Sequence, residues 1–175
     1  MITKVTKLKV CMIGATGVGK TSLVGRLVHS IFSETYRTTI GVQIEAYEMH
    51  RGNHKVQLII WDLSGEDEFQ SVQPAYVSGS AGYLLVVDGT RRETVDTGRT
   101  LEERVRHAAG NVPFVAVVNK ADLVASWEMR PADLEPLRKR ASGVVETSAR
   151  SGVGVREAFE LLVGAILTRM SPQWT

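Results

Sequence analysis

The sequence contains a glycine-rich segment with the spacing of a phosphate-binding turn. Residues 14–21 read Gly-Ala-Thr-Gly-Val-Gly-Lys-Thr and follow an apolar run over residues 8–13 that is typical of a strand. Such a turn lets consecutive backbone N–H groups converge on a phosphate chain, while Lys20 can reach the β- and γ-phosphates and the Thr21 hydroxyl can bind Mg²⁺. The alternative, a glycine-rich turn without a ligand, is disfavoured because helix-compatible residues 21–24 follow directly.

A second polar motif follows an apolar run at residues 113–118. Residues 119–122 read Asn-Lys-Ala-Asp. The Asp122 carboxylate can accept two hydrogen bonds from N1–H and the N2 amino group of guanine, whereas adenine offers no such donor pair. The alkyl stem of Lys120 can cover the base, and Asn119 can brace neighbouring loops. The alternative is an ordinary polar turn at the end of a strand.

Both motifs come after strand-like runs, and open α/β sheets bind ligands at that end of their strands. Apolar runs alternate with helix-like stretches, which predicts an α/β fold whose mostly parallel sheet is covered on both faces. Strands are expected at residues 8–13, 41–49, 55–61, 82–87, 113–118 and 143–146, with 50–54 closing an antiparallel hairpin. Helices are expected at 93–109, around Pro131 and Pro136, and through the apolar repeat Val155, Phe159, Leu162 and Ile166.

Length and composition limit the remaining possibilities. With 175 residues, 43% of them hydrophobic, the chain can bury one substantial core, and we expect a single domain over residues 1–175. The 21 basic and 19 acidic residues are spread along the chain, so nothing indicates a nucleic-acid partner. Cys11 is the only cysteine, which excludes an intrachain disulfide and fits a reducing compartment. Without a signal peptide, a membrane-spanning run or a lipidation motif, a cytoplasmic protein with no intrinsic lipid anchor is expected.

Together the motifs resemble those of Ras-like small GTPases, particularly the Rab-type branch and its bacterial relatives. The likeness extends from about Lys7 to Thr168. It implies a P-loop NTPase fold with a six-stranded, mostly parallel sheet, one antiparallel strand and helices on both faces. It also implies a molecular switch that binds GTP or GDP with Mg²⁺, hydrolyses GTP, and meets effector and regulatory proteins through two switch regions.

The resemblance assigns further residues to the nucleotide. Residues 38–41 resemble the first switch, whose Thr39 would bind Mg²⁺ and the γ-phosphate, and residues 61–65 resemble the second. Residues 146–150 resemble the segment whose alanine N–H reads guanine O6, and Phe32 aligns with an aromatic residue beside the base, with simple core packing as its alternative. The implied nucleotide contacts are Gly14, Thr16, Gly17, Val18, Gly19, Lys20, Thr21, Ser22, Phe32, Thr39, Asp62, Gly65, Asn119, Lys120, Asp122, Ser148, Ala149 and Arg150, and the implied Mg²⁺ ligands are Thr21, Thr39 and Asp62.

The sequence departs from the family near the scissile phosphate. Glu66 stands where relatives have the glutamine that orients the attacking water. An ionised carboxylate about 5 Å from the γ-phosphate is repelled by about 3 kcal/mol per pair of unit charges at an effective dielectric near 20. Thr16 adds a β-branched side chain that narrows the approach for an incoming arginine. We therefore expect slow intrinsic hydrolysis.

The candidate catalytic residues are Glu66, Lys20, Thr39 and Gly65. Arg37 is a further candidate, for a positive charge supplied from within the chain, against the alternative of a solvated loop arginine.

Several other side chains are candidates for partner or metal sites. Ile44, Trp61 and Tyr76 match an apolar effector surface of Rab-like proteins, with burial of Trp61 in the core as the alternative. The arginine-rich stretch 91–106 is interspersed with acidic residues, which predicts a solvated helix face. The histidines His29, His50, His54 and His107 lack metal-ligand spacing and are expected at the surface.

Two other functions fit parts of the pattern. A hydrolysis-deficient pseudo-GTPase would use the nucleotide only as a signalling ligand, and Glu66 favours it. A small P-loop phosphotransferase would pass the phosphoryl group to a metabolite, but residues 119–122 would have no role in it. Phosphate release under single-turnover conditions tests the first alternative, and preference for ATP over GTP would favour the second.

Overall fold

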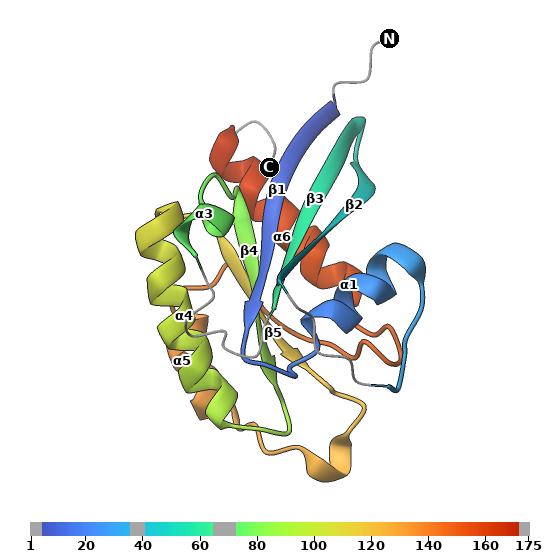
Figure 1. Ribbon diagram of the computed structural model, residues 1–175, viewed down its shortest axis with the longest axis vertical. Coiled ribbons are helices and arrows are strands. Elements are labelled where there is room, and N and C mark those ends of the chain that lie inside the picture. The colour runs from blue at the N-terminus through green and yellow to red at the C-terminus, as the bar shows by residue number, and fades with distance from the viewer. Residues whose placement is uncertain (1–4, 36–40, 65–72, 172–175) are drawn as a thin grey trace.

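The computed structural model describes residues 5–35, 41–64 and 73–171 (Figure 1). Over these residues the chain forms a six-stranded sheet in the order β2-β3-β1-β4-β5-β6. The strands are β1 (Val5–Gly14), β2 (Gly41–Arg51), β3 (His54–Ser64), β4 (Gly82–Asp88), β5 (Phe114–Asn119) and β6 (Val144–Glu146). β2 and β3 pair antiparallel and every other pairing is parallel, which confirms the expected mostly parallel α/β sheet.

The helices expected at 93–109, around Pro131 and Pro136, and through Val155 and Ile166 are confirmed, whereas the short helix at Pro74–Val77 was not predicted. The helices are α1 (Lys20–His29), α3 (Pro74–Val77), α4 (Glu93–Ala109), α5 (Pro131–Arg138) and α6 (Val155–Met170), with a short 3₁₀ turn η1 (Val124–Ser126). Pro131 occupies the first turn of α5, where its missing N–H has no helical partner to lose, and Pro136 lies inside that helix. None of the helices in the described part of the chain is long and apolar enough to cross a bilayer.

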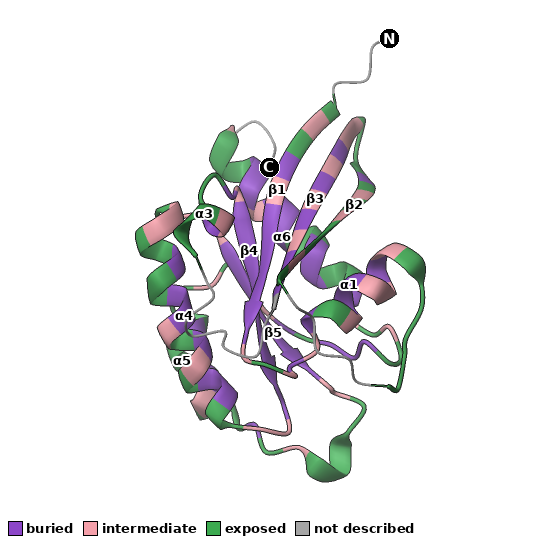
Figure 2. Ribbon diagram, in the orientation of Figure 1, coloured by how far each residue is buried: buried purple, intermediate pink, exposed green. Residues whose placement is uncertain are grey.

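Two apolar layers hold the sheet between its helices. Helices α1 and α6 cover one face, and α3, α4 and α5 cover the other (Figure 1). The predicted stripe on α6 is confirmed, because Val155, Phe159, Leu162 and Ile166 are all buried. Strands β4 and β5 are buried along their whole length, as central strands covered on both faces must be (Figure 2).

The sheet brings the ends of distant strands to one edge. β1 ends at Gly14, β4 at Asp88 and β5 at Asn119, and the register pairs Gly14 with Val86 and Asp88 with Asn119. Because these strands run parallel, the segments that follow them meet at the same edge, as expected for ligand sites in open α/β sheets. The two polar motifs of the sequence therefore face each other across that edge.

The prediction of a solvated face on α4 is wrong at Glu102. Its side chain is buried, and its two carboxylate oxygens each lie 2.8 Å from the Arg140 guanidinium. The Tyr83 hydroxyl donates a hydrogen bond to the same carboxylate at 3.5 Å, and burial, together with this negative charge, raises the pKa of Tyr83. Glu102 follows Gly98 by four positions and therefore lies on the buried face of the helix, although a glutamate side chain is usually exposed to solvent.

The histidines are not all at the surface either. His29, His50 and His107 are exposed, as expected, whereas His54 at the start of β3 is only partly exposed.

Candidate nucleotide site

A cleft of about 930 Å³ opens at the edge where the two motifs meet. It is lined by residues of the 14–21 turn and α1, by the segments that follow β5 and β6, and by residues 31–35. From the predicted set the lining includes Thr16, Gly17, Gly19, Lys20, Thr21, Ser22, Phe32, Asp62, Asn119, Lys120, Asp122, Ala149 and Arg150. Gly14, Val18 and Ser148 are instead buried behind the wall of the cleft.

Two glycines of the turn have conformations and neighbours that a side chain would disturb. Gly19 has φ 102°, and a Cβ on it would lie 2.3 Å from Nδ2 of Asn119. Gly14 has φ 153°, and a Cβ there would lie 2.2 Å from the carbonyl oxygen of Val86. The turn is therefore pressed closely against β4 and β5, and two of its glycines, Gly17 and Gly19, line the cleft without a side chain of their own.

Lys20 is the first residue of α1, and its side chain is only 4% exposed. Its ammonium group donates hydrogen bonds to the carbonyl oxygens of Gly14 at 2.9 Å and Ala15 at 3.0 Å. These bonds fold the long side chain back over the turn, so its positive charge lies where phosphate oxygens would gather. The helix N-terminus beside it adds a partial positive charge of the same sign.

Of the residues expected to hold Mg²⁺, Thr21 and Asp62 are among the described residues, and they lie next to each other. The Thr21 hydroxyl donates a hydrogen bond to Oδ2 of Asp62 at 2.5 Å. Oδ1 of Asp62 is buried and has no hydrogen-bond partner among the described residues. Burial raises the pKa of Asp62, although Thr21 and Lys20 counteract this effect. A hydroxyl and a buried carboxylate with an unused oxygen form the oxygen-rich donor set that Mg²⁺ prefers.

Asn119 joins the phosphate-binding turn to the segment after β6. Its Nδ2 donates to the Val18 carbonyl oxygen at 2.9 Å, while its Oδ1 accepts from the Thr147 hydroxyl at 3.0 Å and from the Ala149 N–H at 3.3 Å. The bracing role expected for this residue is therefore present. All of these contacts are buried, so water does not compete with them.

The side chain proposed to read the base is itself positioned by a neighbour. Asp122 is exposed at the cleft, and its Oδ1 accepts a hydrogen bond from the buried Ser148 hydroxyl at 2.7 Å. Ser148 also accepts a hydrogen bond from the Ser151 N–H at 3.1 Å, which orients its hydroxyl. A carboxylate held in this way presents its remaining lone pairs to a flat donor edge such as that of guanine.

Phe32 is not a core residue. Its side chain is 36% exposed and lines the cleft, so simple core packing, the alternative reading of this residue, does not describe it. Nearby, Arg150 forms an ion pair with Glu34 at 3.0 Å. An aromatic ring and a pair of long side chains thus border the base end of the cleft.

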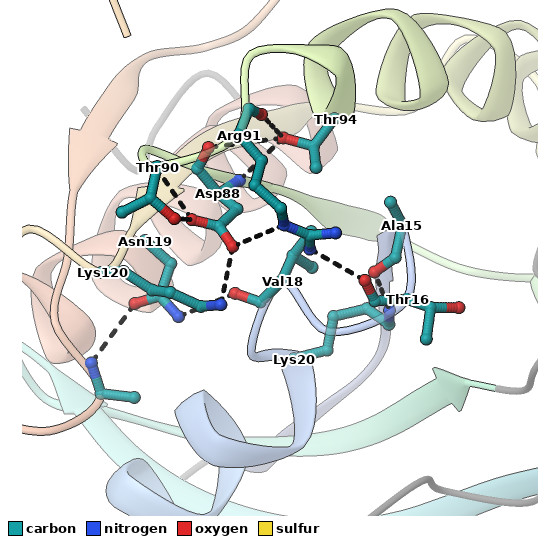
Figure 3. Close-up of polar contacts among 11 residues, drawn as sticks. Ala15, Thr16, Val18, Lys20, Asp88, Thr90, Arg91, Thr94, Asn119 and Lys120 are labelled. Carbon is teal, nitrogen blue, oxygen red and sulfur yellow. Dashed lines mark hydrogen bonds and ion pairs between the residues drawn. The ribbon is translucent and has the colours of Figure 1, made fainter. Parts of the chain in front are cut away.

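Three residues outside the cleft lining and outside the sequence motifs hold the lining segments together, namely Arg26, Asp88 and Arg91. The Arg26 guanidinium donates to the carbonyl oxygens of Ala149, at 2.7 Å, and Arg150, which ties α1 to the segment after β6. Asp88 and Arg91 connect the 14–21 turn to Lys120 (Figure 3). No local motif marks these residues, since each contact joins segments more than 30 positions apart except Asp88 with Arg91.

Four predicted catalytic or switch residues lie outside the described residues, namely Arg37, Thr39, Gly65 and Glu66.

The expected effector surface is only partly buried. Ile44 is 55% exposed and lies opposite Trp61 in the β2–β3 register, so the two share one face of the sheet. The rings of Trp61 and Tyr76 are 6.4 Å apart, and the Lys9 ammonium lies 4.1 Å from the centre of the Trp61 ring. Trp61 is partly exposed and also packs against the buried cluster beneath it, so it is neither wholly core nor wholly surface.

Comparison with known proteins identifies a family and several relatives that are similar to this chain. Residues 9–168 match the Ras family. The chain is 35% identical over 168 residues to Ras-related protein Rab-25 of Canis lupus familiaris, covering 94% of this chain and 78% of the relative. It is 33% identical over 155 residues to Ras-related protein Rab-22A of Homo sapiens, covering 87% and 80%. It is also 33% identical over 161 residues to Ras-related protein Rab-31 of Rattus norvegicus, covering 89% and 81%.

Proposed function

We propose that this chain, which belongs to the Ras family of small GTPases, binds Mg²⁺–GTP in the cleft between residues 14–21 and 119–122. As a member of that family, it is a nucleotide-dependent switch that hydrolyses GTP. Asn119 carries the proposal. One side chain supports both the phosphate-binding turn, through Val18, and the base-reading segment, through Thr147 and Ala149. Asn119 would therefore fix the segment that binds the phosphates and the segment that binds the base relative to each other.

At the phosphate end, the backbone amides of residues 17–21 and the Lys20 ammonium would bind the β- and γ-phosphates. The position of Gly17 and Gly19 in the cleft lining and the buried position of Lys20 support this role. Thr21 and Asp62 would hold Mg²⁺, together with Thr39 from the first switch. Held by these residues, Mg²⁺ would supply positive charge that offsets the negative charge of the phosphates.

At the base end, Asp122 would select guanine. Its carboxylate accepts hydrogen bonds, and guanine presents N1–H and an amino group on one edge, whereas adenine presents an acceptor at N1. Ser148 would position Asp122, and Phe32 and the stem of Lys120 would pack on the ring. Ala149 would donate its N–H to guanine O6 in exchange for its 3.3 Å hydrogen bond to Oδ1 of Asn119. The alternative function, a small P-loop phosphotransferase that passes phosphate to a metabolite, would give residues 119–122 no role.

The proposed base selectivity is tested by competition binding with Asp122→Ala. The wild-type protein should bind GDP far more tightly than ADP, and the variant should lose most of that preference because its guanine-reading carboxylate is gone. Val124→Ala, an exposed side chain two positions later that does not line the cleft, serves as the control and should keep the preference. If Asp122→Ala discriminates between GDP and ADP as well as the wild-type protein does, Asp122 is not the selecting residue.

For hydrolysis, the family's water-orienting glutamine is replaced by Glu66, so we propose that intrinsic turnover is slow. A carboxylate cannot donate a hydrogen bond to the γ-phosphate or to the water as an amide can, and its charge repels the phosphate. Gly65 would contribute its N–H to the γ-phosphate. Arg37, two residues before Thr39, is a candidate for a positive charge supplied from within the chain, with a solvated loop arginine as the alternative. The substitution thus favours a switch whose active state persists until a partner or another residue completes the site.

Nucleotide state would be read through Ile44, Trp61 and Tyr76. This surface combines an exposed aliphatic side chain with two partly exposed aromatic rings, the composition of an interface centre. Ile44 and Trp61 lie on β2 and β3, the strands next to the two switches, and Tyr76 lies on α3, so effector and regulatory proteins could sense either switch through this surface. The indole N–H resonance of Trp61 should therefore shift when GDP is exchanged for a non-hydrolysable GTP analogue, and an unchanged resonance would remove this support.

We also expect the protein to work in the cytoplasm, because its one cysteine, Cys11, is buried and unpaired as in reducing compartments.

A further inference from the structure

Asp88 is a buried carboxylate at the site edge that the proposed binding contacts do not use. It is the last residue of β4, and its side chain is fully buried. Its Oδ2 pairs with the Lys120 ammonium at 2.6 Å and with Nε of Arg91 at 3.0 Å (Figure 3). A buried negative charge must be compensated, and here one compensating cation, Lys120, lines the nucleotide cleft while the other, Arg91, contacts the phosphate-binding turn.

The turn that carries Asp88 and Arg91 is held in one conformation. Oδ1 of Asp88 accepts hydrogen bonds from the N–H of Thr90 at 2.9 Å and from its hydroxyl at 2.7 Å. The Thr94 hydroxyl accepts from the Asp88 N–H at 3.0 Å and donates to the Arg91 carbonyl oxygen at 2.7 Å. On the other side, a Cβ on Gly89 would lie 1.9 Å from the Trp127 ring, so the indole packs directly on the turn.

Arg91 extends from this turn to the phosphate-binding turn. While its Nε contacts Asp88, its Nη2 donates a hydrogen bond to the backbone carbonyl oxygen of Thr16 at 2.9 Å. The guanidinium is planar and rigid, so its Nε and Nη2 move together. The contact of Nε with Asp88 therefore fixes the position from which Nη2 binds the Thr16 carbonyl oxygen. In a planar trans peptide the C=O and the following N–H point in opposite directions, so a fixed Thr16 carbonyl also fixes the Gly17 N–H.

Lys120 is constrained by the same carboxylate. It has φ 69°, a left-handed conformation that a residue with a side chain adopts only when its surroundings hold it there. Its ion pair with Asp88 supplies such a restraint at the residue whose stem lines the base end of the cleft. Asp88 thus restrains one residue at the phosphate end and one at the base end.

We propose that Arg91 is a positioning residue for the nucleotide phosphates, anchored by Asp88 and acting through the Thr16 carbonyl. The inference rests on the proposed nucleotide binding. Arg91 lowers the rate of GDP release by keeping the 16–17 peptide oriented, with its N–H directed to the phosphates. Asp88 contributes at both ends of the cleft, because it also restrains Lys120.

The test is the rate of release of a fluorescent GDP analogue from Mg²⁺-loaded protein into excess unlabelled GDP. Arg91→Ala should release it about tenfold faster, the effect of losing one charge-assisted hydrogen bond. Arg92→Ala is the matched control, because Arg92 is the next residue and its guanidinium pairs with Asp133 at 2.6 Å, away from the cleft. Its release rate should stay within about twofold of the wild-type rate.

Two further variants separate positioning from simple stabilisation. Arg91→Lys keeps a positive charge beside Asp88 but has no second arm for Thr16, so release should remain fast while the melting temperature of the nucleotide-free protein is preserved. Asp88→Asn should accelerate release at least as much as Arg91→Ala, and the double variant should show less than the product of the two effects.

The outcomes distinguish this inference from the proposed function. If the wild-type protein binds no GDP, the proposed function fails. If the wild-type protein binds GDP but Arg91→Ala releases it at the wild-type rate, or Arg91→Lys fully restores that rate, the Thr16 contact does not position the phosphates. If the melting temperature of Arg91→Ala falls by the same amount with and without GDP while its GDP release rate is unchanged, the role of Arg91 is merely structural.

Discussion

The side-chain amide of Asn119 donates a hydrogen bond at 2.9 Å to the backbone carbonyl of Val18, which lies 101 positions earlier in the chain. Through this bond the end of β5 supports the phosphate-binding turn after β1. The other atom of the same amide, Oδ1, accepts hydrogen bonds from Thr147 and Ala149. A single planar group therefore fixes three segments of the candidate site relative to one another.

Replacing Asn119 with alanine should weaken GDP binding by about 100-fold, because three buried hydrogen bonds of about 1 kcal/mol each disappear. Equilibrium titration with a fluorescent GDP analogue measures the change. Asn53→Ala, at an exposed position of the β2–β3 turn, is the control and should leave affinity unchanged. An Asn119→Ala protein that is folded and binds GDP like the wild-type protein would contradict the bracing role.

Gly19→Ala should abolish measurable GDP binding for a different reason. Its Cβ would lie 2.3 Å from Nδ2 of Asn119, so either the turn or the asparagine must move. Gly110→Ala is matched to it, because Gly110 also has a left-handed φ of 80° but has no atom within 4 Å of the added Cβ. The control should lose about 1 kcal/mol of stability from backbone strain and keep its GDP affinity. Equal GDP affinities in the two variants would show that the contact with Asn119 is unimportant.

Arg140→Ala should lower the free energy of unfolding by about 2 kcal/mol, because it leaves the buried Glu102 carboxylate without its cation. Urea denaturation measures the loss. Arg138→Ala, two positions earlier at an exposed site on α5, should change stability by less than about 0.5 kcal/mol. Similar values for the two variants would mean that Glu102 gains little from its partner.

The carboxylate of Asp133 should make stability depend on pH in a narrow acidic range. Hydrogen bonds from Arg92 and from the Arg130 backbone lower the pKa of Asp133 from 3.8 to about 2. Because the pKa in the folded state is the lower one, the stabilisation is complete above the unfolded value of 3.8 and is lost as the pH falls toward about 2.

Thermal unfolding of the wild-type protein and of Asp133→Asn across this range tests the sign. The difference in melting temperature should be constant above about pH 5 and should shrink as the pH falls. A difference that grows as the pH falls would contradict this direction.

Much of the site could be predicted from the sequence because its chemistry lies in contiguous motifs. The turn at residues 14–21 and the segment at 119–122 each combine a preceding buried strand with side chains whose hydrogen-bonding capacity suits a phosphate or a base. The sheet order then needs only parallel strands to bring the two motifs to one edge.

The remaining contacts could not be predicted because they depend on tertiary packing. Arg91 meets Thr16 across 75 positions, and Arg26 meets Ala149 across 123. In the sequence, Arg91 begins a stretch of mixed charges that is typical of a solvated helix, and only the sheet register shows that it faces the phosphate-binding turn. Glu102 was misjudged for the same reason, since a glutamate in a charged helix is buried only when a cation such as Arg140 is delivered from elsewhere.

Glu66→Gln should accelerate GTP hydrolysis by about tenfold, because the substitution removes a negative charge near the γ-phosphate and restores an amide that can orient water. Single-turnover measurements with both proteins preloaded with GTP give the rates directly. Glu68→Gln, which removes a carboxylate two positions later, controls for the general effect of charge. A wild-type protein that is fast and is slowed by Glu66→Gln would make the glutamate a working catalytic residue.

The central claim is that the cleft holds a guanine nucleotide with Mg²⁺, and calorimetric titration of nucleotide-stripped protein tests it most directly. GDP and GTP should bind with a stoichiometry of one, more tightly with Mg²⁺ than with a chelator, and ADP should bind far more weakly. No heat of binding with either guanine nucleotide, or equal affinity for GDP and ADP, would contradict the account.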